Sequence, residues 1–183
     1  MTREMAIADI FGGWDREIPG IGRANGMPVT DVDCSEGPNR GRIYVNWTDL
    51  RFGDSDVWVC HSDDQGETWS APKRVNSDET STDQFFTWMA VDDYTGYVHI
   101  VYYDRSCNVT AAGLDTDVVV ATSKDGGATW SHLTVSESHF TPGKASFFGD
   151  YNNISAAQGV VRPIWTREDR GVLSIWTAIL EDQ

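Results

Sequence analysis

A duplicated segment constrains the fold of this 183-residue chain more than any other feature. The runs 54–70 and 115–131 align without a gap, and a partial third copy begins at Ser174. Each complete copy starts with alternating β-branched residues and leads into an acid- and glycine-rich turn that ends in Thr-Trp-Ser. Repetition of one supersecondary unit indicates a repeat architecture, in which each unit packs on the next.

Further β-type runs flank each copy at matching places. One set ends in an acid and an arginine, and it comprises 42–51, 98–105 and 161–170. Another set lies upstream and is followed by turn residues, and it comprises 27–33, 87–92 and 150–155. A fourth short run follows two of the acid-glycine turns, at 72–76 and 132–136. Each unit therefore reads as four short antiparallel strands, which predicts an all-β chain of β-propeller blades.

The repeats set the predicted organisation of the chain. We predict one domain over 1–183 with about three blades, at 14–80, 81–138 and 139–183, the last without its fourth strand. The run 5–10 has strand-like composition and stands ahead of the first blade. We therefore predict that residues 1–13 supply a strand that closes an otherwise open blade.

Composition excludes several classes of function. The chain has 28 acidic and 14 basic residues, a formal net charge of −14, so nucleic-acid binding is not expected. No apolar run is long enough to cross a bilayer, and the first residues lack the apolar core of a signal peptide, so neither a membrane partner nor a leader is expected. Three cysteines are too few for a disulfide scaffold. The cellular location stays undetermined.

Two turns carry a specific resemblance. The spacing Ser-x-Asp-x-Gly-x-Thr-Trp occurs twice, formed by Ser62, Asp64, Gly66, Thr68 and Trp69, and by Ser123, Asp125, Gly127, Thr129 and Trp130. This pattern resembles the Asp-box, or BNR repeat, of the sialidase-like superfamily. The resemblance implies a six-bladed propeller, of which this chain matches the C-terminal half, in a family that is often secreted. It also implies a structural role for the boxes on the rim away from the active face, since short polar side chains in turns usually bond the turn itself.

Strand order then places other residues at the opposite end of each blade. The loops after the second strands begin with Asp49 and Arg51, with Asp104 and Arg105, and with Asp169 and Arg170. In sialidases, arginines from separate blades grip the carboxylate of the substrate, because a guanidinium fork matches a carboxylate. The resemblance makes these six residues candidates for substrate binding. The alternative is that each arginine pairs with the neighbouring aspartate and fixes its loop.

The resemblance also implies catalytic roles. The family uses a tyrosine nucleophile assisted by a glutamate, which makes Tyr151 and Glu168 the catalytic candidates, with Tyr103 as a second tyrosine. Trp14 and Trp88 are candidates for stacking on sugar rings or for core packing. The family's early Arg-Ile-Pro signature is missing, so two functions stay open: a glycosidase-type protein acting on or recognising acidic sugars, and a non-catalytic glycan-binding or protein-interaction propeller.

Cofactors and partners follow from the same considerations. The four histidines show no metal-ligand spacing, so no metal site and no cofactor are predicted. Acid pairs such as Asp31/Asp33 and Asp54/Asp56 could hold Ca²⁺, although solvated loop acids are the simpler interpretation. Three blades cannot close a ring, so we predict a homodimer that completes six blades, with a glycan as a possible ligand. The alternative is that the chain is half of a longer propeller.

Overall fold

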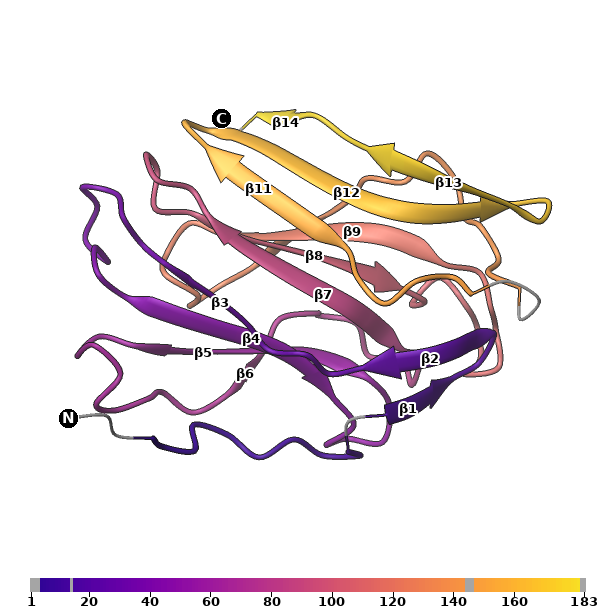
Figure 1. Cartoon of the computed structure of the whole chain (residues 1–183), viewed down its shortest axis with the longest axis horizontal. Coiled ribbons are helices and arrows are strands. Elements are labelled where there is room, and N and C mark those ends of the chain that lie inside the picture. Colours follow the sequence, from indigo (N-terminus) through magenta and orange to yellow (C-terminus); the bar gives the residue numbers. More distant parts are fainter. Residues whose placement is uncertain (1–3, 14, 144–146, 182–183) are drawn as a thin grey trace.

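The computed structural model describes residues 4–13, 15–143 and 147–181, and all regular structure in them is β-strand. Three antiparallel sheets lie one upon the next, and a separate hairpin lies beside one end of their strands (Figure 1). This confirms the predicted all-β architecture of four-stranded propeller units. No helix in the described part of the chain is long and apolar enough to traverse a bilayer.

The first two sheets follow the predicted order of four strands, and the third differs in its last strand. The first contains β3 (Val29–Val32), β4 (Ile43–Asp49), β5 (Asp56–Ser62) and β6 (Lys73–Arg74). The second contains β7 (Gln84–Val91), β8 (Val98–Asp104), β9 (Asp117–Ser123) and β10 (Ser131–Thr134). The third contains β11 (Asn153–Ala157), β12 (Val160–Asp169), β13 (Val172–Thr177) and β14 (Leu180–Glu181), where β13 and β14 both pair with β12. We call these sheets blades 1, 2 and 3.

The middle blade is buried on both faces, which explains its continuous apolar strands. Successive side chains of β8 point to opposite faces, as the strand period of two requires. Ile100 and Tyr102 join the core shared with blade 1, whereas Val101 and Tyr103 join the core shared with blade 3. The repeat therefore encodes two packed interfaces, one on each side of blade 2.

The hairpin of β1 (Asp15–Ile18) and β2 (Ile21–Asn25) belongs to none of the blades. It lies at the end from which the β4–β5, β8–β9 and β12–β13 connections emerge (Figure 1). Ile18, Ile21 and Ala24 are buried in the core between blades 2 and 3. The predicted blade range 14–80 therefore contains an element that the repeat pattern did not reveal.

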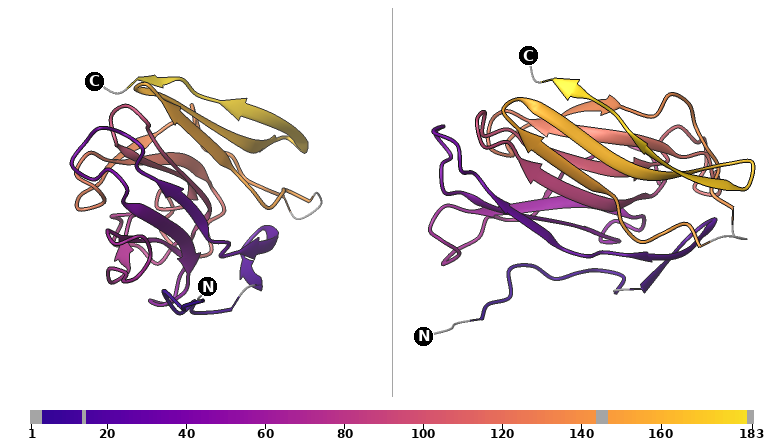
Figure 2. Two further views of the ribbon diagram at one scale, coloured as in Figure 1. Left: turned by 60° about the vertical axis from the view of Figure 1, so that its left-hand side comes forward. Right: turned by 45° about the horizontal axis from the view of Figure 1, so that its top comes forward.

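The N-terminal segment does not form the strand expected over residues 5–10. It runs along the outer side of blade 1 (Figure 2). There Ile7, Ala8 and Ile10 pack against a cluster that comprises Val45, Trp47, Trp58 and Cys60. Covering the two tryptophans removes a large apolar area from water, whereas pairing with the short edge strand β6 would cover little.

Candidate functional site

The two Asp-box turns use their polar side chains internally. Asp64 accepts hydrogen bonds from the Ser62 hydroxyl at 2.8 Å, the Thr68 amide at 2.8 Å and the Thr68 hydroxyl at 2.6 Å. Asp125 repeats these contacts with Ser123 and Thr129 at the same distances. Hydrogen bonds led by the threonine hydroxyl lower the pKa of each aspartate to about 2.

The backbone and the tryptophans of these turns also serve the fold. Gly66 and Gly127 adopt φ values of +90° and +89°, which favour glycine. Trp69 packs beside the outer cluster of blade 1, and Trp130 packs against the core between blades 1 and 2. The turns therefore have their side chains committed to local structure, at the end of the blades opposite to the β4–β5 and β8–β9 loops.

Arg51 is bound by its own neighbour. Its guanidinium donates to Asp49 from Nε at 2.9 Å and from Nη2 at 2.6 Å, and it stacks over the Trp58 ring. Asp49 is fully buried, which raises its pKa, but hydrogen bonds from Arg51 and Trp47 outweigh burial and leave the pKa below its ordinary value. The contacts describe a loop anchor, as in the alternative interpretation of the sequence.

Arg105 lies beneath the β1–β2 hairpin. It is 1 % exposed, and it donates to the Pro19 carbonyl at 2.5 Å and to the Thr116 hydroxyl at 3.2 Å. Burial lowers its pKa to about 10. Asp104 is not its partner, because this carboxylate accepts hydrogen bonds from Gln84 and Ser106. A guanidinium in this position cannot reach a ligand unless the hairpin moves.

Blade 3 departs from the predicted pairing. Asp169 is bonded by Arg167, whose Nε and Nη2 lie 2.7 and 3.0 Å from its carboxylate oxygens. Arg170 is exposed and occupies the β12–β13 turn with φ of +53°. The sequence prediction paired Asp169 with Arg170 because the two are adjacent in the chain. In a strand, side chains two residues apart lie on the same face, so Arg167 is the partner of Asp169. Arg51, Arg105 and Arg170 therefore have three different environments, and among the described residues Arg51 and Arg105 share no hydrogen-bond partner.

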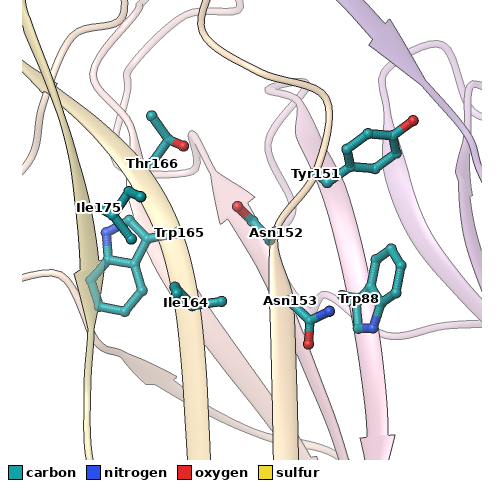
Figure 3. Close-up of a pocket in the computed structure, with 8 residues that line it drawn as sticks. All are labelled: Trp88, Tyr151, Asn152, Asn153, Ile164, Trp165, Thr166 and Ile175. Carbon is teal, nitrogen blue, oxygen red and sulfur yellow. The ribbon is translucent and has the colours of Figure 1, made fainter.

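The structure instead gathers another set of residues around the start of β11. A shallow pocket of about 420 Å³ lies on the outer face of blade 3, with β12 and β13 on one side of β11 and β7 on the other (Figure 3). We call it the Trp88–Tyr151 pocket, and its lining comprises Trp88, Tyr151, Asn152, Asn153, Ile164, Trp165, Thr166 and Ile175. These residues come from four segments, so no sequence spacing signals the site.

A strained backbone position supports the pocket. Phe86 has φ of +51°, and the pairing of β7 with β8 shifts register between Phe85 and Trp88. The buried Asn152 holds this bulge through a hydrogen bond of 3.0 Å to the Phe86 carbonyl. Bulges and rare backbone conformations concentrate at functional sites, where they direct a side chain. Here the bulge sets the direction of Trp88.

Two polar atoms of the lining lack partners among the described residues. They are Oδ1 of Asn152 and Nε1 of Trp165, and both are buried. Buried polar atoms without a partner are rare, because each loses its hydrogen bonds to water.

The two catalytic candidates, Tyr151 and Glu168, lie in different surroundings. Tyr151 is 57 % exposed and lines the pocket, whereas Glu168 is 7 % exposed and its carboxylate accepts a hydrogen bond of 2.9 Å from the Gly143 amide. Tyr103 is buried between blades 2 and 3, and burial raises the pKa of its hydroxyl far above the ordinary value. Trp14 lies outside the described residues.

A cation that the sequence did not single out lies beside Tyr151. Arg23 of β2 donates to Asp150 from Nε at 3.0 Å and from Nη2 at 2.5 Å. Its side chain is 57 % exposed, while that of Asp150 is 9 % exposed. The two residues are 127 positions apart, so only the fold brings them together. Of the acids that could hold Ca²⁺, Asp31 accepts from the Val91 amide, and Asp56 accepts from Arg74 and Asn76.

Comparison with solved structures identifies the fold. An α-L-arabinanase from Penicillium chrysogenum, solved with arabinobiose, aligns with a TM-score of 0.61 and 15 % identity over 86 % of this chain and 46 % of its own. A family 117 glycoside hydrolase from the marine bacterium Zobellia galactanivorans aligns at 0.53 and 13 %, over 95 % and 57 %. A Hadza microbial sialidase aligns at 0.50 and 15 %, over 75 % and 32 %.

The chain shares the β-propeller fold of these structures. It spans between about a third and just over half of the length of these structures, so its blades form a partial propeller. No family model matches the sequence. The fold is shown at identities of 13 to 15 %, which leaves substrate and activity to be argued from the residues themselves.

Proposed function

We propose that this chain is the carbohydrate-recognising part of a glycosidase-type propeller and that the Trp88–Tyr151 pocket is its binding surface. One observation carries the proposal: an open pocket lined by aromatic rings and by amide and hydroxyl groups. Sugars present C–H faces that pack on aromatic rings and hydroxyl groups that bond to amides and hydroxyls. The glycoside hydrolases among the structural neighbours support the same class of ligand.

The lining favours binding over cleavage. None of its eight residues is acidic or basic. Glycoside hydrolysis needs an acid and a nucleophile or base on the two sides of the scissile bond. Tyr151 meets one part of that requirement, but Glu168 is bonded to Gly143 and does not line the pocket. A neutral lining on a protein of net charge −14 also favours neutral sugars over acidic ones.

Recognition of an acidic sugar is the second candidate, and Arg23 favours it. Its exposed guanidinium lies beside Tyr151 and stands over the Phe147 ring. A ligand carboxylate could take part of the fork only by competing with Asp150, which already forms two hydrogen bonds with it. Binding of a sialoside should then depend on Arg23.

Titration of the protein with neutral oligosaccharides and with sialyllactose tests both candidates. A glycan array selects the probes, and calorimetry measures their affinities. We expect Tyr151→Ala and Asn153→Ala to weaken binding of a neutral glycan about tenfold each. Tyr94→Ala is the matched control, because Tyr94 is 76 % exposed in the β7–β8 turn.

Three outcomes separate the possibilities. Binding that Tyr151→Ala leaves unchanged contradicts the pocket. Selective binding of sialyllactose that Arg23→Gln abolishes supports the acidic-sugar candidate. Turnover of a fluorogenic sialoside above the buffer rate, lost in Tyr151→Phe, would replace the binding proposal by a catalytic one.

A further inference from the structure

Three side chains with metal-binding chemistry meet at the edge of blade 2. Cys107 lies in the β8–β9 loop, Asp117 is the first residue of β9, and His139 follows β10. Their ligand atoms, a thiol sulfur, a carboxylate oxygen and an imidazole nitrogen, all lie within 4.8 Å of one another. None of the three lines the Trp88–Tyr151 pocket.

Backbone pairing fixes the three segments relative to one another. The Thr116 amide donates to the Phe140 carbonyl at 2.8 Å, and the Phe140 amide donates back at 3.1 Å. This isolated bridge holds Asp117 and His139 side by side. On the other side, the Asn108 side chain donates to the Asp115 carbonyl at 2.7 Å and holds the loop that carries Cys107.

The carboxylate of Asp117 is oriented before any ion arrives. The Ser136 hydroxyl donates to its Oδ1 at 3.0 Å, and Oδ2 faces Nδ1 of His139 at 2.8 Å. Partners that orient a ligand in this way are a regular feature of metal sites. In a tetrahedral zinc site, neighbouring nitrogen and oxygen ligands lie about 3.3 Å apart, given bonds of about 2.0 Å. A small separation of His139 from Asp117 therefore makes room for an ion.

The surroundings favour a cation and allow it to enter. Partial burial, together with the negative charges of Asp117, Asp104 and Asp115, raises the pKa of the Cys107 thiol to about 11. The same negative charges attract a positive ion. Cys107 is exposed, and the side chains of His139 and Asp117 are 57 % and 13 % exposed, so solvent reaches the cluster.

We propose that Cys107, Asp117 and His139 bind a divalent cation of the Zn²⁺ class. The donor set decides the class, because a sulfur, a nitrogen and an oxygen suit zinc, whereas calcium and magnesium prefer oxygen alone. On binding, the sulfur–metal bond replaces the S–H bond of Cys107, and the proton leaves to solvent. Three protein ligands leave the fourth tetrahedral position to water. The spacings between the three ligands in the sequence match no metal motif, so the site could not be predicted from them.

Calorimetric titration of chelator-stripped protein with Zn²⁺ tests the proposal. We expect one high-affinity equivalent, weakened at least about tenfold by Cys107→Ser and by His139→Gln. Cobalt gives a second readout: a thiolate-to-cobalt charge-transfer band in the wild type that Cys107→Ser removes. Zinc should also raise the melting temperature of the wild type and not that of Cys107→Ser.

Two control variants separate this site from general metal affinity. Cys34→Ser removes another exposed free thiol, and His61→Gln removes a histidine that lies 3.8 Å from the Asp63 carboxylate, outside the proposed ligand set. Both should bind zinc like the wild type. The proposal is overturned if the wild type takes up no zinc in competition with a weak chelator, or if Cys107→Ser and His139→Gln bind it unchanged.

Discussion

The carboxylates of Asp64 and Asp125 are held in their charged form by hydrogen bonds from a serine and a threonine in the same turn. The pKa of each is about 2, against an ordinary value of 3.8. A depressed pKa contributes stability that is present above the ordinary value and is lost as the pH falls through the folded value. We therefore expect the free energy of unfolding to decrease between about pH 4 and pH 2.

Replacing both aspartates tests whether they cause this loss of stability at low pH. Asp64→Asn combined with Asp125→Asn should lower the free energy of unfolding at pH 7, because each turn loses charge-assisted hydrogen bonds. It should also flatten the dependence on pH within the same window. Urea unfolding at a series of pH values measures both effects, with Asp93→Asn, on the exposed β7–β8 turn, as the control. An unchanged slope in the double variant would assign the acid sensitivity to other carboxylates.

At the scale of elements, the hydroxyl group of Tyr103 connects blade 2 to blade 3. Tyr103 donates to the Thr166 carbonyl at 2.6 Å and accepts from the Thr166 amide at 3.1 Å. We expect Tyr103→Phe to lower the free energy of unfolding by about 1–2 kcal/mol, because both backbone groups lose a buried partner. Chemical denaturation measures the change, and Tyr94→Phe should leave stability unaltered.

The hairpin of β1 and β2 gives a prediction that separates stability from binding. Arg105→Met keeps much of the side-chain volume but removes the hydrogen bonds to Pro19 and Thr116. We expect a loss of about 1–3 kcal/mol in the free energy of unfolding and no change in glycan affinity. A large loss of affinity in folded Arg105→Met would restore the arginine to substrate binding and contradict its assignment as a support for the hairpin.

The strands of the blades could be predicted because their residues repeat. Alternating apolar positions such as those of β8 and the turn pattern around Asp64 are local signals, and each recurs at a matching place. The hairpin and the path of residues 4–13 have no such signal, and of the pocket lining only Trp88 and Tyr151 were candidates from the sequence. Arg23 meets Asp150, and Cys107 meets His139, only through tertiary packing. A contact between distant residues that occurs only once leaves no repeat in the sequence. A site built from such contacts therefore cannot be predicted from residue spacing.

For the whole molecule, closure of the ring is the open question. The outer face of blade 3 exposes large apolar side chains, of which Ile175 is 78 % and Leu173 40 % exposed. Ile175 also lines the Trp88–Tyr151 pocket. Exposed apolar faces of this kind mark interaction surfaces. We maintain the prediction that two copies associate, and association through this face would compete with a glycan for the Trp88–Tyr151 pocket. Light scattering on a sizing column should give twice 20.3 kDa, and Ile175→Glu should return the protein to 20.3 kDa. A wild-type mass of 20.3 kDa at high concentration would refute association through this face.

The position of the N-terminal segment has a consequence for how far such association can proceed. In the described part of the chain, residues 4–13 cover the outer face of blade 1, while the outer face of blade 3 stays bare. A protein with two different, complementary association faces can add copies without limit and form a fibre. With one face already covered, each copy has one face left for association. A dimer formed through that face has no free face for a third copy. We therefore expect that removing the segment would change an association that stops at two copies into one that continues.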